Sequence, residues 1–314
     1  MQGVTAYGTQ EADSSGNDRT AGHDAQSVPE NATDTFRAWR GIGLRTMSAM
    51  LVLSLRRVGT RAFEAHCQWP RLHPLNERRI PVAHHPLIMV ESLRQLAALL
   101  DRGDTQQDAA LEPVSVRLGL RAGAQPLESG DATDVQVRLT VTDIAREGAR
   151  VVACRVSGDC LHDGTAFGSC TMRLVRRARG TGVQPSADAV PPVGLLYPTA
   201  EAVGAAAETD VLLARTPQGR LALAPRDPGH PVYLPGRPPF LPAAALLEAG
   251  RQAMLLASGR TAAAVTGLSV DVHSPVPSGG GAFMELTGQS LSARFAVLAD
   301  GRAAATGTVG LLGA

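Results

Sequence analysis

The spacing of apolar residues divides the chain into segments with the two-residue period of strands and two segments with the period of a helix. Val and Leu dominate residues 47–68 on both sides of a turn at residues 56–60, which predicts a strand pair. A helix is predicted at residues 87–101, where apolar residues recur at helical spacing. Alternation and β-branched residues then predict further strands at residues 114–120, 134–143, 149–158 and 165–175.

The second half of the chain repeats this order of elements. A strand pair is predicted at residues 211–213 and 220–224, followed by a proline-rich loop at 227–242 and a helix at 243–258. Four strands are expected after the helix, at residues 263–273, 282–290, 294–298 and 303–312. The order of elements therefore indicates a duplicated domain.

Polar residues repeat together with the apolar pattern. Glu91, Arg94 and Gln95 in the first helix correspond to Glu248, Arg251 and Gln252 in the second, each pair 157 residues apart. A period this long indicates duplicated domains and not a solenoid.

These boundaries divide the chain into four parts. We expect a disordered tail at residues 1–34, which lack periodicity and are rich in Gly, Ser, Thr, Asp and Asn. A first domain is expected at residues 35–180, a linker rich in Gly, Pro and Ala at 181–207, and a second domain at 208–314.

The strands that follow each helix are joined by turns too short for parallel crossovers, so each domain should hold an antiparallel sheet. Each helix is apolar nearly all round, which is expected when a curved sheet encloses it. The predicted fold is α+β: two antiparallel sheets, each wrapped around one long helix and packed as a pseudo-dimer. One chain then completes the assembly, so a monomer or a weak homodimer is expected.

Composition excludes several classes of function. The chain has 30 basic and 29 acidic residues and a net charge of +1, which argues against binding nucleic acid or a charged membrane surface. Every basic residue apart from histidine is Arg, so Schiff-base and P-loop lysine chemistry are excluded. The longest apolar run, residues 47–55, is half of what a bilayer needs, and the N-terminus is unlike a signal peptide. A cytoplasmic protein without a metal site is expected.

The two polar triplets are the first candidates for chemistry. Residues at positions i, i+3 and i+4 project from one region of a helix, and polar groups in an apolar helix are costly to bury unless they are paired. A Glu–Arg salt bridge at the domain interface would explain one copy. Two copies with the same spacing favour a pair of pseudo-symmetric sites, with Glu91 and Glu248 as catalytic carboxylates.

The loops that lead into the helices supply further candidates. His85 precedes Pro86 at the start of the first helix, and His73 lies in the preceding loop; either could take a proton from an attacking hydroxyl. Backbone N–H groups at a helix start could polarise a thioester carbonyl. Residues expected to contact the substrate are Arg94, Gln95, Arg251 and Gln252 on the helices and Trp69, Arg71 and Arg237 in the loops.

Three stretches resemble the A-factor synthase family. CQWPRLHPL and HHPLIMVESLRQLAALL are similar to the first half of that family, and FLPAAALLEAGRQAMLLA is similar to its second half. The resemblance implies a tandem hotdog protein without a cofactor. It also implies transfer of a β-ketoacyl group from an acyl carrier protein or coenzyme A thioester to the hydroxyl of dihydroxyacetone phosphate. The product would lead to a γ-butyrolactone, furan or butenolide signal that controls antibiotic production.

The chain departs from this family in its second half. Where the family has an Asp-His pair, residues 239–243 read Pro-Phe-Leu-Pro-Ala, Tyr233 is the alternative match, and His230 is the nearest histidine. Two alternatives therefore remain open: a thioester hydrolase or dehydratase on the same scaffold, and an inactive homologue that binds an acyl ligand.

Overall fold

A single antiparallel sheet of twelve strands forms the body of the protein in this computed structural model. The structure describes residues 44, 47–75, 84–101, 109–121, 132–178, 194–261, 263–289 and 291–312. The predicted N-terminal tail lies outside these residues. Among them, no helix is long and apolar enough to cross a membrane.

The first half of the sheet surrounds the first helix. Its strands run in the order β1-β2-β4-β5-β6-β3. The bounds are β1 (Val52–Arg57), β2 (Ala62–Pro70), β3 (Ala109–Leu120), β4 (Ala132–Glu147), β5 (Arg150–His162) and β6 (Thr165–Ala178). The helix α2 (Leu87–Leu100) contacts β1, β2, β3, β5 and β6, so the predicted strand pair, helix and four strands are all present.

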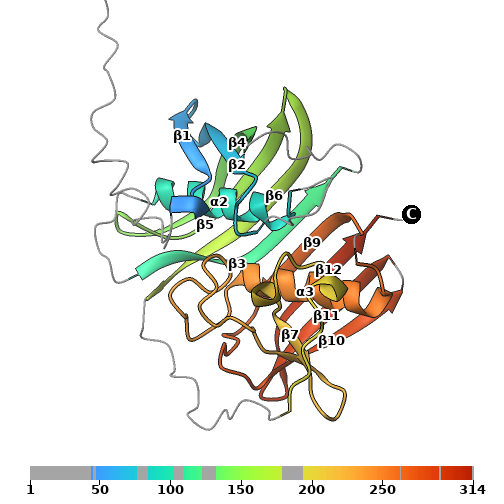
Figure 1. Cartoon of the computed structure of the whole chain (residues 1–314). Coiled ribbons are helices and arrows are strands. Elements are labelled where there is room, and N and C mark those ends of the chain that lie inside the picture. The colour runs from blue at the N-terminus through green and yellow to red at the C-terminus, as the bar shows by residue number, and fades with distance from the viewer. Residues whose placement is uncertain are drawn as a thin grey trace, which may run out of the picture.

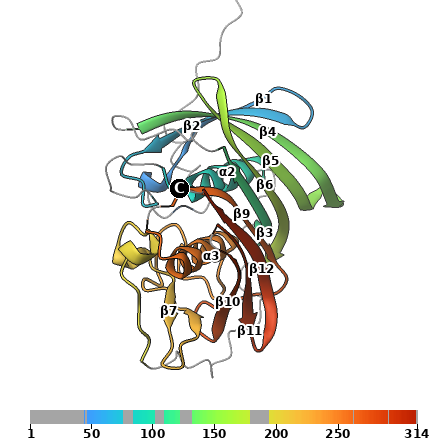
Figure 2. The ribbon, with the colours of Figure 1, turned by 90° about the vertical axis from the view of Figure 1, so that its right-hand side faces the viewer.

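The second half follows the same plan with shorter strands. Its order is β9-β12-β11-β10-β8-β7, around the helix α3 (Ala243–Ser258). The bounds are β7 (Leu213–Arg215), β8 (Leu221–Leu223), β9 (Val265–Val272), β10 (Ala282–Gln289), β11 (Ser292–Ala299) and β12 (Arg302–Leu311). In each half, a curved part of the sheet thus surrounds one helix (Figures 1 and 2).

The two halves share one sheet, and the prediction of two separate sheets is wrong. Strands β3 and β9 pair in register from Ser115↔Asp271 to Gly119↔Gly267. Each of them is an outer strand of its own half, and an unpaired strand edge tends to pair with another. Joining the two edges places α2 and α3 next to each other on the same side of the curved sheet, where they touch (Figure 2).

The end of the predicted linker packs against the second half. Leu196 pairs with Arg215, and residues 201–203 form the short helix η2 (Glu201–Val203). The carbonyl of Gly204, which follows η2, accepts a hydrogen bond from Arg251 at 2.7 Å. Residues 194–207 therefore help to hold α3 in place.

Two glutamines tie the helices to the loops ahead of the first strand pairs. Gln95 donates to the carbonyl of Ala49 at 2.7 Å and accepts from the N–H of Leu51 at 2.9 Å. Gln252 makes the corresponding bonds with the carbonyl of Asp210 at 2.8 Å and the N–H of Leu212 at 2.9 Å. Each buried side-chain amide therefore bonds one backbone carbonyl and one backbone N–H just before the first strand of its half, where these groups lack a backbone partner.

Large and small residues fit together in opposite ways in the two halves. In the first half the helix carries Leu93, and a Cβ on Gly158 of β5 would lie 2.9 Å from its methyl group. In the second half the helix carries Gly250, and a Cβ there would lie 2.5 Å from the ring of Phe295 on β11. The contact between helix and sheet is therefore filled in both halves, with the large residue on the helix in the first half and on the strand in the second half.

His84 is a buried core residue at the entry to α2. Its Nε2 lies 2.8 Å from the hydroxyl of Thr133, and its ring meets Trp69 edge-on with centroids 5.3 Å apart. Burial lowers the pKa of His84 to about 4, so the ring is neutral at pH 7.

Replacing Gln252 with leucine should destabilise the protein by about 3–5 kcal/mol. The change leaves the carbonyl of Asp210 and the N–H of Leu212 buried without a partner, and each such group costs about 1–3 kcal/mol. It also removes one of the two hydrogen bonds to Oε1 of Glu248, which keeps its bond from Arg251. Denaturant unfolding measures the loss. Gln136→Leu, at an exposed position of β4, is the control and should change stability by less than about 0.5 kcal/mol.

Stability should rise with pH between about 4 and 6.5. The folded pKa of His84 lies below its ordinary value of 6.5, so the unfolded chain binds the proton more tightly and stability is lost as the pH falls through this window. Unfolding curves at a series of pH values test this. His84→Gln should reduce the slope without abolishing it, because the pKa of His73 is lowered in the same way, and an unchanged slope would contradict the assignment.

Candidate functional site

The two halves meet in one buried contact between a histidine and a carboxylate. Nε2 of His85, in the loop before α2, lies 3.3 Å from Oε2 of Glu248 on α3, and both side chains are at most 3% exposed. The predicted catalytic residues of the two halves are therefore brought together by the pairing of β3 with β9. Neither half alone contains this pair.

Glu248 is held by its own helix. Arg251 donates to both carboxylate oxygens at 2.8 Å, and Gln252 donates to Oε1 at 2.8 Å. Burial alone would raise the pKa of Glu248, but the Arg251 guanidinium and His85 outweigh it and lower that pKa to about 2. Glu248 therefore stays ionised at any pH near neutrality, with Oε2 directed at His85.

The start of α2 orients the ring of His85. The backbone N–H of Leu87 donates to Nδ1 of the ring at 3.2 Å. A nitrogen that accepts cannot carry the proton, so the neutral ring holds its proton on Nε2, the atom that faces Glu248. Because Leu87 and Ile88 direct their N–H groups at the side chain and carbonyl of His85, the first turn of α2 is already capped.

The first-half triplet has the same internal bonds without the histidine. Arg94 donates to both oxygens of Glu91 at 2.7 Å, and Gln95 donates to Oε1 at 2.8 Å. At the spacing of 157 residues, Pro242 occupies the position that corresponds to His85. The hydrogen-bonded Glu-Arg-Gln triplet is therefore present in both halves, whereas a histidine at this position is present only in the first half.

His73 and His230 occupy corresponding positions in the two helix-entry loops, again 157 residues apart. Burial lowers the pKa of His73 to about 4, against smaller opposing effects of the Glu91 carboxylate and the Ala49 backbone. His230 instead meets a charged partner, with Nε2 at 3.1 Å from Oδ1 of Asp210. His73 and His230 are therefore both buried in the loops that lead into the helices.

The remaining predicted contact residues are distributed differently. Trp69 is a core residue, 1% exposed, whose indole N–H donates to Ser92 at 3.0 Å, so its assignment as a substrate contact is not supported by its position. Arg251 is equally buried and is committed to Glu248 and Gly204. Arg71 and Arg237 are exposed on the two helix-entry loops. Arg94 is partly exposed, at 28%.

Asp210 and Gly204 were missed by the sequence pattern although they support the second half of the site. Asp210 bonds His230 through its side chain and Gln252 through its carbonyl, and Gly204 accepts from Arg251. Both lie in or beside the predicted linker, where no periodic signal marks them. An offset of 157 residues from Ala49 leads to residue 206, between Gly204 and Asp210, and is the one available signal.

Comparisons with known proteins return only distant likenesses. No protein-family model and no curated protein sequence matches the chain. Among solved structures, the chain is similar to a putative thioesterase from Novosphingobium aromaticivorans, with 14% identity, 82% of this chain and 97% of that chain covered, and a TM-score of 0.49.

Two further structures are similar at the same level. An acyl-ACP thioesterase from Bacteroides thetaiotaomicron is 9% identical over 79% of this chain and 98% of its own, with a TM-score of 0.46. The dehydratase domain from the terminal module of the rifamycin polyketide synthase is 14% identical over 87% and 99%, also with a TM-score of 0.46. At these identities and TM-scores the likenesses do not assign any chemistry to this chain, which has to be inferred from its own residues.

Proposed function

We propose that the protein is an acyltransferase in which His85 and Glu248 act as one reactive pair. The observation that carries the proposal is the 3.3 Å contact between these two buried groups, contributed by different halves of the molecule. A buried carboxylate aimed at a histidine is an arrangement that moves protons. In the A-factor synthase family, which the sequence resembles, the acyl donor is a β-ketoacyl thioester on a carrier protein and the acceptor is dihydroxyacetone phosphate.

The proposed reaction needs one proton carrier and no redox step. The hydroxyl oxygen of the acceptor bonds to the thioester carbon while its proton passes to Oε2 of Glu248, because Nδ1 of His85 accepts from Leu87 and Nε2 already carries the ring proton. The tetrahedral intermediate then collapses, the carbon–sulfur bond breaks, and the pair returns the proton to the departing thiolate.

The rest of the site supports this pair. Arg251 keeps Glu248 ionised and fixed, which is a positioning role, and its burial leaves it no access to a phosphate. The first turn of α3 follows Pro242 without a side-chain cap, so its N–H groups are the candidates to hold the oxyanion of the intermediate. Exposed Arg71 and Arg237 are the candidates to bind the phosphate of the acceptor.

The first-half triplet has a structural role in this proposal. Glu91 is held by Arg94 and Gln95 in the same geometry, but Pro242 stands where a partner histidine would be needed. One reactive pair per chain is therefore proposed, with Glu91 retained because an unpaired Arg94–Gln95 frame would be costly to leave near the core. Domain boundaries at residues 35–180 and 208–314 remain part of this proposal.

Glu248→Gln should lower kcat by about 10²–10⁴-fold while the protein still folds. Glutamine keeps the size of the side chain and an acceptor for Arg251 but removes the charge that faces His85. Product ester formed from β-ketoacyl carrier protein and dihydroxyacetone phosphate is measured by mass spectrometry, with thermal unfolding alongside. The matched change Glu91→Gln should keep activity within a few-fold. Equal losses in both variants would contradict a single reactive pair.

His85→Asn should reduce turnover by roughly 10²-fold or more and leave the fold intact. The asparagine carbonyl can still accept the N–H of Leu87, but the side chain no longer presents a ring N–H to Oε2 of Glu248. His273→Asn, at an exposed position bonded to Thr306, is the control and should be unaffected. If free β-keto acid forms in place of the ester, the same pair activates water and the protein is a hydrolase.

A further inference from the structure

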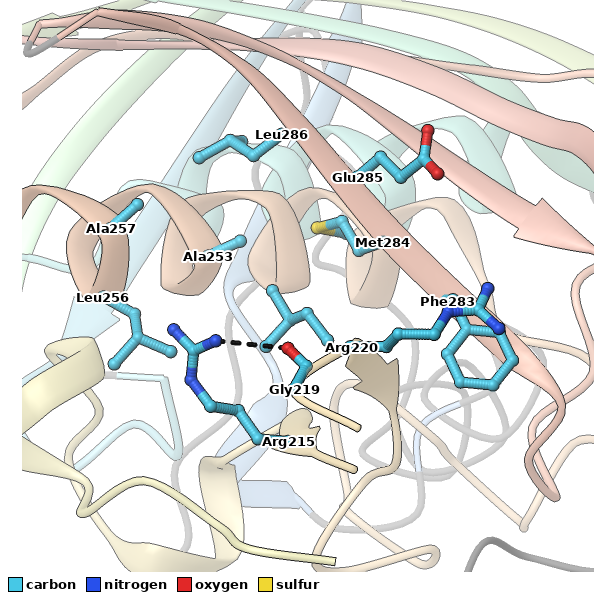
Figure 3. Close-up of a pocket in the computed structure, with 11 residues that line it drawn as sticks. Arg215, Gly219, Arg220, Ala253, Leu256, Ala257, Phe283, Met284, Glu285 and Leu286 are labelled. Carbon is cyan, nitrogen blue, oxygen red and sulfur yellow. Dashed lines mark hydrogen bonds between the residues drawn. The ribbon is translucent and has the colours of Figure 1, made fainter. Parts of the chain in front are cut away.

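A pocket of about 310 Å³ opens on the second half, away from the His85–Glu248 contact. It lies between the last two turns of α3, the β7–β8 hairpin and β10, as Figure 3 shows. Its apolar lining includes Ala253, Leu256, Met284 and Leu286. Ala253 is five positions after Glu248, which turns it by about 140° around the helix axis, so the pocket and the reactive pair occupy different sides of α3.

Two differences between the halves create this space. Strand β2 pairs with β4 over nine residues, whereas β8 pairs with β10 only at Phe283↔Ala222 and Met284↔Leu221, which leaves the flank of α3 uncovered. At the spacing of 157 residues, Ala253 corresponds to Leu96, which is 0% exposed in the core of the first half. The second half thus has a methyl group where the first half fills the same place with an isobutyl group.

Two arginines stand at this pocket. The guanidinium of Arg215 points from β7 towards α3 and donates one long bond, of 3.4 Å, to the carbonyl of Gly219 (Figure 3). Arg220 lies flat on the ring of Phe283, with Cζ 3.7 Å from the ring centroid. Glu285, the acidic residue of the lining, directs its carboxylate away from Arg215 (Figure 3). The apolar floor is therefore bordered by positive charge.

We propose that this pocket binds a medium-chain carboxylic acid, which has an alkyl chain and one carboxylate end. The alkyl chain would lie on Ala253, Leu256 and Met284, and the carboxylate would accept hydrogen bonds from Arg215, whose guanidinium has five N–H donors and matches a carboxylate in shape. The pocket volume is at the lower end of the roughly 300–1,000 Å³ of ligand sites. The apolar floor and the positive charge of Arg215 and Arg220 fit a ligand with one apolar chain and one anionic end.

Calorimetric titration of the full chain with octanoate tests the proposal, with octan-1-ol as the uncharged probe of equal chain length. Octanoate should bind the wild-type protein more tightly than octan-1-ol. Arg215→Ala should weaken octanoate binding by about tenfold, the loss of one charge-assisted bond, and leave octan-1-ol binding unchanged. Arg138→Ala, at an exposed position on β4, is the matched control and should change neither.

Filling the pocket gives an independent test. Ala253→Leu copies the first-half residue Leu96 and should abolish binding of both probes, with thermal unfolding confirming that the variant is folded. Absence of octanoate binding to the wild-type protein would overturn the proposal, as would octanoate binding that survives both Ala253→Leu and Arg215→Ala. These measurements record binding and not turnover, so their outcome is separate from that of the His85–Glu248 proposal.

Discussion

Burial of a charged carboxylate inside each helix-in-sheet unit is the constraint on which the rest of the structure depends. An isolated carboxylate could not be kept ionised in an apolar core, because desolvation would cost several kcal/mol. Arg251 and Gln252 resolve this for Glu248 with three hydrogen bonds, and Gln252 extends the network to the backbone of the adjacent loop. The same hydrogen bonds thus fix the Glu248 carboxylate within the fold and leave its Oε2 facing His85.

The joined sheet gives this network a second consequence. Because β3 and β9 pair edge to edge, the entry of α2 is brought against the body of α3, and His85 reaches Glu248. This contact between residues far apart in the chain depends on the angle and register of the β3–β9 pairing. Loss of the register would separate the two groups even if both halves stayed folded.

The two halves of the molecule follow one plan but differ at particular positions. The internal bonds of the two triplets are the same, yet Pro242 replaces a histidine, Gly250 and Phe295 exchange sizes with Leu93 and Gly158, and Ala253 replaces Leu96. The β7–β8 hairpin is also shorter than its counterpart. These differences leave the helix-in-sheet arrangement of both halves intact. The first half has the histidine, and the second half has an open pocket.

The sequence by itself determined the order of helices and strands, the duplication and the residues of both triplets. Apolar periodicity reports local geometry, and a polar triplet at i, i+3 and i+4 must share one side of its helix. The sequence did not place Trp69 in the core, because an aromatic residue beside a polar loop has the same pattern in a core as in a binding site. Tertiary structure alone decided that the two sheets merge, that His85 meets Glu248 and not Glu91, and that Arg251 is sealed from solvent. Pairing of sheet edges and burial depend on contacts between residues far apart in the chain, which no local spacing encodes.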